Sequence, residues 1–337
     1  MNQKELLTLA ETIIDGDSPA KEQYRAIADI PESHAFTLLT GADMIRDHYF
    51  GRRIHLCTIC NGKSGRCSED CGFCAQSVFA KTDAPVYPLM EKAKLQEGGR
   101  HACQGPINRY AIVTSGKRLP RSEVGAVAEA IAGLDQDRIK TCASMGILDA
   151  EDFRILKNAG VSRYHHNLET AQSYFTQVCT THTYQQRIDT ILVAKEAGLS
   201  VCSGGVFGIG ETDEQVLELA LALKGLDVDA VPINFLVPVA GTKLENSEPI
   251  TPLRCLKIIA IFRYVLPEKE IIICGGRESN LKELHPLIFH AGASGIMTNN
   301  YLTTSGRSFT EDLEMLEHLK FEIVDGLSRE RTRTWCP

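Results

Sequence analysis

The 337-residue sequence lacks three features that mark common classes of protein. No apolar run approaches the roughly 18 residues of a membrane span. The formal net charge is -7, so the chain has no excess of Lys and Arg to neutralise nucleic-acid phosphates. No low-complexity tract and no internal repeat of fixed period is present. We therefore expect neither a membrane nor a nucleic acid as partner.

Cysteine, in contrast, is abundant. Leu6, Leu9 and Ile13 recur at helical spacing near the N-terminus, which predicts an amphipathic helix and not a signal peptide, so we expect a cytoplasmic protein. A reducing compartment disfavours disulfides and makes metal ligation or catalysis the better explanation for clustered thiols. Five of the twelve cysteines fall between Cys57 and Cys74.

Short apolar runs alternate with helix-patterned stretches after residue 50, the rhythm of repeated βα units. The expected strands are Ile54–Ile59, Tyr110–Thr114, Arg138–Cys142, Arg163–His166, Ser200–Ser203, Ala230–Phe235, Ile271–Cys274 and Gly295–Met297. The expected helices include Ser122–Gly133, Asp149–Ala159, Tyr184–Ala197, Glu214–Leu223, Leu253–Tyr264 and Asn280–Ala291.

This rhythm predicts an α/β fold of the (βα)8 TIM-barrel type. We expect a helical extension over 1–50, a barrel over 51–320 and a C-terminal tail over 321–337, with a partly open barrel or a doubly wound sheet as alternatives. Barrel active sites lie at the C-terminal ends of the strands. The residues expected at or near that mouth are Cys142, Asn167, Cys202, Asn234 and Arg277.

Three thiols follow the first expected strand in the spacing Cys67-x3-Cys71-x2-Cys74. They are close enough to hold one inorganic cluster, and three thiolates on four irons leave one iron open. A zinc site needs a fourth ligand, which only recruitment of Cys57 and Cys60 would supply. We therefore favour a four-iron four-sulfur (4Fe-4S) cluster.

This motif, with Phe73 before its last cysteine, resembles the signature of the radical S-adenosylmethionine (SAM) superfamily. The resemblance implies that SAM chelates the open iron and is cleaved by one electron to methionine and a 5′-deoxyadenosyl radical. Within the superfamily the chain resembles biotin synthases, radical SAM sulfurtransferases that convert dethiobiotin to biotin. The matching pieces are Lys63–Ser77, Tyr164–Thr170, Thr183–Thr190, Val201–Thr212, Val231–Leu236 and Gly275–Glu278.

The resemblance assigns SAM to Asn167, Glu169 and Arg187, with Phe73 beside it. The residues alone leave alternatives: Glu169 or Thr170 could cap a helix, and Arg187 could be a solvated helix-face residue. The glycines of Val201–Thr212 permit close backbone approach, and we expect them beneath the SAM adenine.

Asn234 ends an apolar run, and the family places this residue against the ureido ring of dethiobiotin. An Asn satisfied by neighbouring core groups is the alternative. His165 stands where the best-known biotin synthases carry Asn, so we do not expect it to be catalytic. We expect the catalytic groups to be Cys67, Cys71, Cys74, Asn167 and Asn234.

The family takes sulfur from an auxiliary iron-sulfur cluster, commonly two-iron, with three cysteines and an arginine. Cys142, Cys202 and Arg277 match three of these ligands, but Ala111 stands where the third cysteine is expected. We hypothesise a variant cluster, two-iron or larger, with Cys57 as the replacement. Cys60 and Cys274 are weaker candidates, because an odd number of strand positions separates Cys60 from Cys57 and Cys274 from Arg277. Side chains alternate between the two faces of a strand, so we expect both thiols to face away from the cluster.

The expected partners are dethiobiotin and a low-potential electron donor such as flavodoxin or ferredoxin, and a homodimer is left open. Two alternative functions remain at this point. One is another radical SAM enzyme of similar barrel, of the hydrogenase maturase or methylornithine synthase type. The other is a non-catalytic iron-sulfur carrier, which would bind iron without cleaving SAM.

Overall fold

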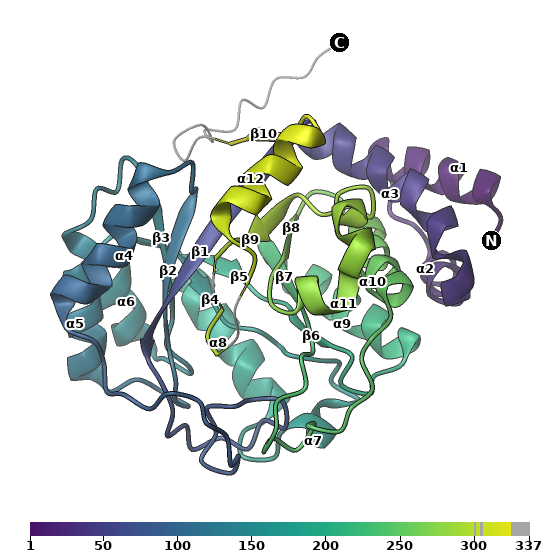
Figure 1. Cartoon of the computed structure of the whole chain (residues 1–337). Coiled ribbons are helices and arrows are strands. Elements are labelled where there is room, and N and C mark those ends of the chain that lie inside the picture. Colours follow the sequence, from purple (N-terminus) through teal and green to yellow (C-terminus); the bar gives the residue numbers. More distant parts are fainter. Residues whose placement is uncertain (300, 304–305, 325–337) are drawn as a thin grey trace.

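In a computed structural model, residues 1–299, 301–303 and 306–324 are described, and eight parallel strands among them close into a barrel (Figure 1). Pairing of the last of these strands with the first completes the ring. The barrel strands are β1 (Arg53–Lys63), β2 (Arg109–Thr114), β3 (Lys140–Ser144), β4 (Val161–His165), β5 (Ser200–Cys202), β7 (Ala230–Phe235), β8 (Glu270–Ile273) and β9 (Gly295–Met297).

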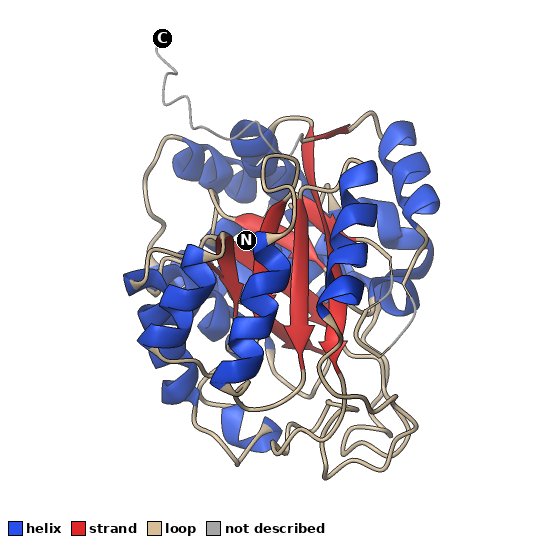
Figure 2. Cartoon of the chain, turned by 90° about the vertical axis from the view of Figure 1, so that its left-hand side faces the viewer, coloured by secondary structure: helices blue, strands red, loops and turns tan. Residues whose placement is uncertain are grey.

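Helices surround this barrel (Figure 2). They are α1 (Gln3–Ile14), α2 (Lys21–Ala28), α3 (Ala35–Phe50), α4 (Lys92–Gln104), α5 (Arg121–Ala132), α6 (Ala150–Asn158), α7 (Phe175–Val178), α8 (Tyr184–Glu196), α9 (Asp213–Gly225), α10 (Pro252–Val265), α11 (Arg277–Leu281) and α12 (Phe309–His318), with 3-10 turns at Glu32–His34 and Lys282–Ile288. No helix in the described residues is both long and apolar enough to cross a membrane.

The closed barrel of eight parallel strands confirms the predicted fold. Two short strands were missed: β6 (Gly205–Phe207) pairs with β7, and β10 (Glu322–Ile323) pairs with β1. The expected boundary at residue 321 therefore precedes a folded segment, while residues 325–337 lie outside the described residues. The helix expected over 280–291 is instead α11 followed by a 3-10 turn that contains Pro286, which cannot donate a helical hydrogen bond.

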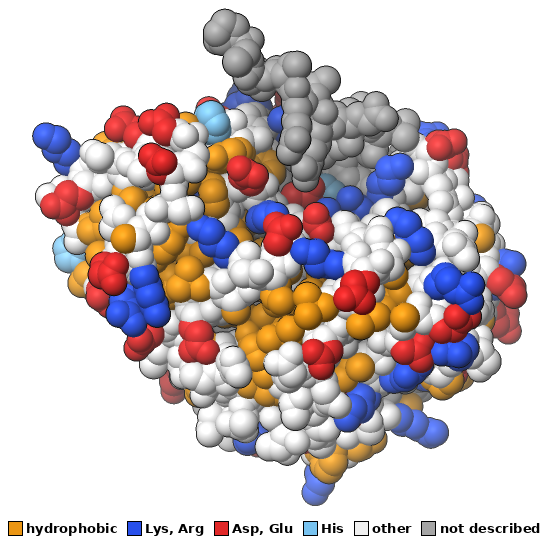
Figure 3. Space-filling model, turned by 180° about the vertical axis from the view of Figure 1, so that it is seen from behind, with side chains coloured by type: hydrophobic (Ala, Val, Ile, Leu, Met, Phe, Trp, Pro, Cys, Tyr) orange, Lys and Arg blue, Asp and Glu red, His pale blue; other side chains and the backbone are white. Residues whose placement is uncertain are grey.

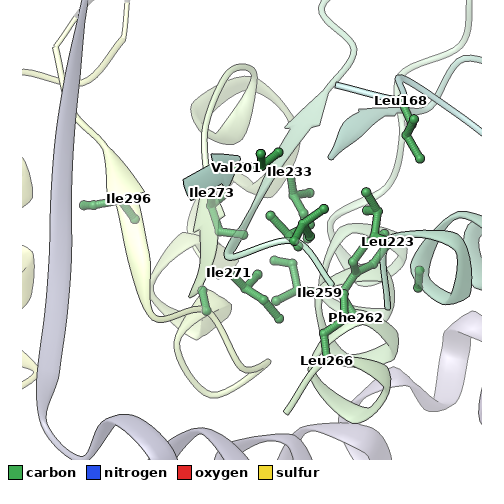
Figure 4. Close-up of a cluster of buried hydrophobic side chains, with 14 of the residues drawn as sticks. Leu168, Val201, Leu223, Ile233, Ile259, Phe262, Leu266, Ile271, Ile273 and Ile296 are labelled. Atoms are coloured by element: carbon green, nitrogen blue, oxygen red, sulfur yellow. The ribbon is translucent and has the colours of Figure 1, made fainter. Parts of the chain in front are cut away.

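The main core lies between the strands and the surrounding helices, and around α10 Ile233, Ile271 and Ile273 meet Ile259 and Phe262 (Figure 4). The N-terminal helices pack against the outside of α10. At Gly41 on α3, a Cβ atom would lie 2.0 Å from the hydroxyl of Tyr264 on α10, so only glycine permits this approach. Alternate strand side chains are left to point into the barrel, where they form the candidate site.

Candidate active site

Inward-pointing side chains enclose one cavity of about 420 Å³ at the C-terminal ends of the strands. Parity along each strand decides which residues reach it: Cys57 and Ile59 do so on β1, whereas Cys60 does not. Among the expected site residues, the cavity is lined by Cys57, Cys67, Cys71, Phe73, Cys74, Cys142, Asn167, Glu169, Arg187, Cys202 and Asn234. The fold therefore brings residues spread over 178 positions of sequence, from 57 to 234, into one space.

The motif cysteines lie on the loop after β1, which turns back over the mouth of the barrel. A hydrogen bond from the Cys74 N–H to the Cys71 carbonyl at 3.0 Å closes a turn within the loop, and one from the Gly72 N–H to the Val178 carbonyl at 2.9 Å ties the loop to α7. Burial raises the pKa of the Cys74 thiol to about 11. Three soft thiol ligands on one loop fit an iron-sulfur cluster. The zinc site considered as an alternative would lack Cys60 as a ligand, because Cys60 faces away from the cavity.

The three residues expected to bind SAM form a hydrogen-bonded group on one wall. Arg187 on α8 donates to the Asn167 carbonyl at 2.7 Å and lies 3.4 Å from the Glu169 carboxylate. The Asn167 amide donates to the other Glu169 oxygen at 3.3 Å. Arg187 is buried, which removes the solvated alternative, and Glu169 forms a bridge with Gly205 in place of capping a helix. The group offers a guanidinium, an amide and a carboxylate to one ligand.

The glycine run lets its segment approach this wall closely. A Cβ atom at Gly204 would lie 2.0 Å from the Pro232 carbonyl oxygen, and one at Gly205 would lie 2.4 Å from the Glu169 carbonyl oxygen. Glycine is therefore required on steric grounds at both positions.

A second set of thiols, which we call the strand thiols, lies on the barrel strands or, for Cys274, directly after β8. Cys57, Cys142, Cys202 and Cys274 all line the cavity, and Cys202 and Cys274 pack together with Cys57 at their edge. Burial, with a smaller contribution from neighbouring thiols, raises the pKa of Cys57 and Cys274 above their usual range and that of Cys202 to about 12. Four neighbouring thiols in an apolar interior suit a soft metal cluster.

The expectation that Cys274 faces away from the cavity was wrong. Ile272 and Cys274 are two positions apart and both line the cavity. The count from Arg277 failed because β8 ends at Ile273 and Arg277 begins α11, so strand alternation does not extend between them.

Comparison with known proteins fixes the family. A model of the radical SAM superfamily matches residues 63–223, and a model described as "Biotin and Thiamin Synthesis associated domain" matches residues 232–322. A biotin synthase of Desulfatibacillum aliphaticivorans is 56% identical over 95% of this chain and 97% of its own length. The chain belongs to the biotin synthase family.

Further relatives agree with this assignment, including a biotin synthase of Geotalea daltonii that is 47% identical over 94% of this chain and 97% of its own length. Among solved structures, a methylornithine synthase matches with a TM-score of 0.81 at 19% identity, over 94% of this chain and 98% of its own. A FeFe-hydrogenase maturase from Carboxydothermus hydrogenoformans matches with a TM-score of 0.76 at 18% identity, over 96% and 80%. At such identities these two structures show the shared fold alone.

Arg277, which matches the family's auxiliary arginine, does not line the cavity. Its fully buried guanidinium lies 2.6 Å from the Asp312 carboxylate and 2.7 Å from His285, and it donates to the Tyr301 hydroxyl at 3.1 Å. Ligation by Arg277 stays a prediction, and it would require at least one of these contacts to break.

Two other arginines, which the sequence did not single out, line the cavity beside the strand thiols. Arg109 approaches the Cys142 sulfur at 3.9 Å, and Arg163 forms a buried ion pair with Glu270 at 2.8 Å. Both cations can stabilise thiolates or an anionic cluster in this apolar interior. Each arginine lies two positions before another residue that lines the cavity: Arg109 before Ala111, and Arg163 before His165. Alternation of side chains along a strand was therefore the signal in the sequence that both arginines point inward.

Asn234 is half satisfied by the protein. Its carbonyl oxygen accepts from the Gly275 N–H at 3.0 Å, and its amide donates to the Gly205 carbonyl at 3.3 Å. One N–H and one lone pair are left over. Because Asn234 also lines the cavity, its side chain can offer this donor and this acceptor to a ligand.

His182 and Glu69 were missed by sequence reasoning, although both lie in or beside the matched segments. Arg187 donates to His182 Nε2 at 2.9 Å, so the ring proton is on Nδ1 and points to Glu69 at 2.5 Å. Burial alone would raise the pKa of Glu69, but hydrogen bonds from His182 and Thr181 lower it. His182 therefore connects the cysteine loop to the Arg187 group.

Proposed function

We propose that the chain is a biotin synthase that inserts sulfur into dethiobiotin with a 4Fe-4S cluster, SAM and an auxiliary iron-sulfur cluster. The observation that carries the proposal is that both thiol sets and Asn234 line one cavity. Dissolved alkyl radicals are quenched quickly, so each reacting carbon has to be held beside the radical source with water excluded.

Cys67, Cys71 and Cys74 would hold the first cluster, which with bound SAM supplies the deoxyadenosyl radical that removes hydrogen from unactivated carbon. Arg187 would bind the methionine carboxylate of SAM, since a guanidinium pairs well with a carboxylate. Asn167 and Glu169 would bind the ribose hydroxyls. Phe73 packs against the cluster of Val178, Ile209 and Leu236 and would help to exclude water at the mouth.

The strand thiols would hold the auxiliary cluster that supplies sulfur. Cys57, Cys142 and Cys202 were expected there, and we add Cys274, which packs in the same group. Four thiols would compensate for Ala111 without requiring Arg277 to leave Asp312. The unused donor and acceptor of Asn234 would bind the ureido ring of dethiobiotin.

An anaerobic assay tests this function. The protein, reconstituted with iron and sulfide, is mixed with dithionite, SAM and dethiobiotin, and the products are measured by mass spectrometry. We expect biotin, methionine and 5′-deoxyadenosine. Formation of deoxyadenosine without biotin would refute dethiobiotin as the substrate. Iron binding without SAM cleavage would indicate a carrier protein.

Two partners complete the proposal. A low-potential carrier such as flavodoxin or ferredoxin would supply the electron, and a homodimer is the assembly that we propose to test by light scattering. A monomeric mass would contradict the dimer without affecting the proposed chemistry.

A further inference from the structure

A compact group of reactive side chains lies beside the mouth of the barrel. The sulfurs of Cys71 and Cys179 and a ring nitrogen of His182 all lie within 4.8 Å of one another, and no other three cysteine, histidine or acidic side chains of the described residues form so close a group. On the back of the molecule, by contrast, acidic and basic side chains are interspersed (Figure 3). The chemistry that the proposed function leaves unused is therefore concentrated at these two thiols.

Hydrogen bonds on both sides hold the two cysteines opposite each other. The Gly72 N–H donates to the Val178 carbonyl at 2.9 Å, and the Thr180 N–H donates to the Asp70 carboxylate at 2.8 Å. Residue numbers rise along one segment as they fall along the other, so the two segments are antiparallel. Opposed residues of antiparallel segments have Cα atoms about 4.5–5.5 Å apart, a separation that a disulfide can bridge. The loop after β1 and α7, which carry these segments, both lie at the lower end of the molecule in Figure 1.

The two thiols differ in their exposure. Cys71 is partly exposed and lines the cavity, whereas Cys179 is 2% exposed and does not line it. The Cys179 sulfur is held by contacts with the Asp70 carboxylate at 3.1 Å and with His182 Nδ1 at 3.2 Å. A small molecule that enters the cavity therefore meets Cys71 first, and Cys179 lies behind it.

We propose that Cys71 and Cys179 form a reversible disulfide when the cluster-free protein meets a low-molecular-weight disulfide such as glutathione disulfide. The Cys71 sulfur attacks one sulfur of the oxidant and breaks its S–S bond, which gives a mixed disulfide and releases one thiol. The Cys179 sulfur then displaces the second thiol. The two cysteines lose two electrons and two protons, and the oxidant gains both as it becomes two thiols.

This disulfide and the first cluster exclude each other, because both use the Cys71 sulfur. The exclusion rests on the proposed function, since it assumes that Cys71 binds a cluster, whereas the bond itself does not. Disulfides of the cytosol are usually transient and redox-sensing. Thiols that respond to oxidation often have a second cysteine beside them, which converts them to a disulfide that thiol reductants reverse. Cys179 is in the position of this second cysteine and protects Cys71 from irreversible oxidation.

Peptide mapping of cluster-free protein tests the bond. The protein is treated with glutathione disulfide, its remaining thiols are alkylated, and it is digested with trypsin without a reductant. We expect peptide 67–81 to be linked to peptide 164–187, in which Cys179 is the single cysteine. Cleavage after Glu69 and Phe73 then separates the three cysteines of the first peptide and should leave the link on Cys71.

Two variants separate the steps of the exchange. Cys179→Ala should stop at a glutathione adduct on Cys71, because the displacing thiol is missing. Cys71→Ser should leave Cys179 unmodified, because the oxidant does not reach it. In both variants the yield of the linked peptide should fall more than about tenfold. Cys255→Ser is the matched control, since Cys255 is fully buried on α10 and should not affect the link.

The rate of cluster assembly tests the exclusion. Iron and sulfide are added to oxidised protein, and the first cluster is identified by the change that SAM causes in its electron paramagnetic resonance spectrum. Prior oxidation should slow its formation about tenfold in the parent, and treatment with a phosphine reductant should restore the rate. Unslowed assembly in protein that carries the disulfide would overturn the exclusion.

Two results of the peptide map would overturn the bond itself. One is a link from Cys71 to Cys67 or Cys74 in the parent. The other is a glutathione adduct that persists on Cys71 of the parent while Cys179 stays free. If the bond forms but the protein makes no biotin, the proposed function fails and the disulfide stands. If the protein makes biotin but the bond never forms, the reverse holds.

Discussion

Removal of the Asp312 carboxylate would leave a fully buried cation without its main partner. Neither Arg277 nor Asp312 has exposed side-chain surface, and their charged atoms lie 2.6 Å apart. The nearest other carboxylate, on Glu278, is 3.8 Å away and partly exposed. Breaking a buried pair from one side costs about 3–5 kcal/mol. We expect Asp312→Ala to reduce the free energy of unfolding by this amount, towards the lower end because Glu278 remains.

Urea unfolding of cluster-free protein, followed by circular dichroism, measures the effect. Arg154→Ala is the control, because it removes an exposed pair with Glu151 of the same 2.6 Å length, which should cost less than about 1 kcal/mol. A loss below about 1 kcal/mol for Asp312→Ala would refute the dependence of Arg277 on this carboxylate.

The same variant also tests cluster ligation by Arg277. If Arg277 binds the auxiliary cluster, the anionic cluster supplies a partner, and Asp312→Ala should cost less in reconstituted protein than in cluster-free protein. An equal cost in both forms would assign Arg277 to structure alone.

The remaining predictions concern single side chains of the site. Cys274→Ser should lower the iron and sulfide content of reconstituted protein, whereas Cys60→Ser should not, because Cys60 faces away from the cavity. His182→Ala should weaken SAM binding about 10- to 100-fold, measured by the change that SAM causes in the cluster's electron paramagnetic resonance spectrum, because Arg187 loses its support. Asn234→Ala should raise the KM for dethiobiotin about tenfold, the equivalent of about 1.4 kcal/mol; an unchanged KM would count against its role. Burial alone would raise the pKa of Asp70, but hydrogen bonds to its carboxylate lower the pKa below the usual value. The ionised Asp70 therefore stabilises the folded protein above the unfolded pKa of about 3.9. This stabilisation is lost as the pH falls towards the folded pKa. Asp70→Asn should therefore lose less stability than the parent between about pH 5 and about pH 2.

The barrel was predictable because each strand carries its own signal. The runs at Ala230–Phe235 and Gly295–Met297 have the bounds expected from the sequence, since both are short, mainly apolar runs that follow helix-patterned stretches. By contrast, β10 has two residues and exists through pairing with Arg53 and Ile54. Such a strand has no local pattern, so sequence reasoning had no means to find it.

The site was predictable only where one residue type carries the chemistry. The motif cysteines needed no tertiary information. Arg163 and Cys274 needed the register of strands distant in sequence, and His182 needed the contact between α8 and the cysteine loop. Family resemblance pointed to Arg277 by its position in the sequence. Its partner Asp312 lies 35 residues later on α12, and no local sequence pattern predicts that these two residues form an ion pair.

The direction of the strands determines which sulfur site lies deeper. All eight strands are parallel, so the loop after β1 that carries Cys67, Cys71 and Cys74 must sit at the mouth, while Cys57 on β1 itself must lie below it. Asn234 hydrogen-bonds to Gly275, the neighbour of Cys274, which puts the proposed substrate contact directly beside the strand thiols. A ligand held by Asn234 would therefore have the proposed radical source above it and the proposed sulfur source beside it, and exchanging the two would require reversal of the strands.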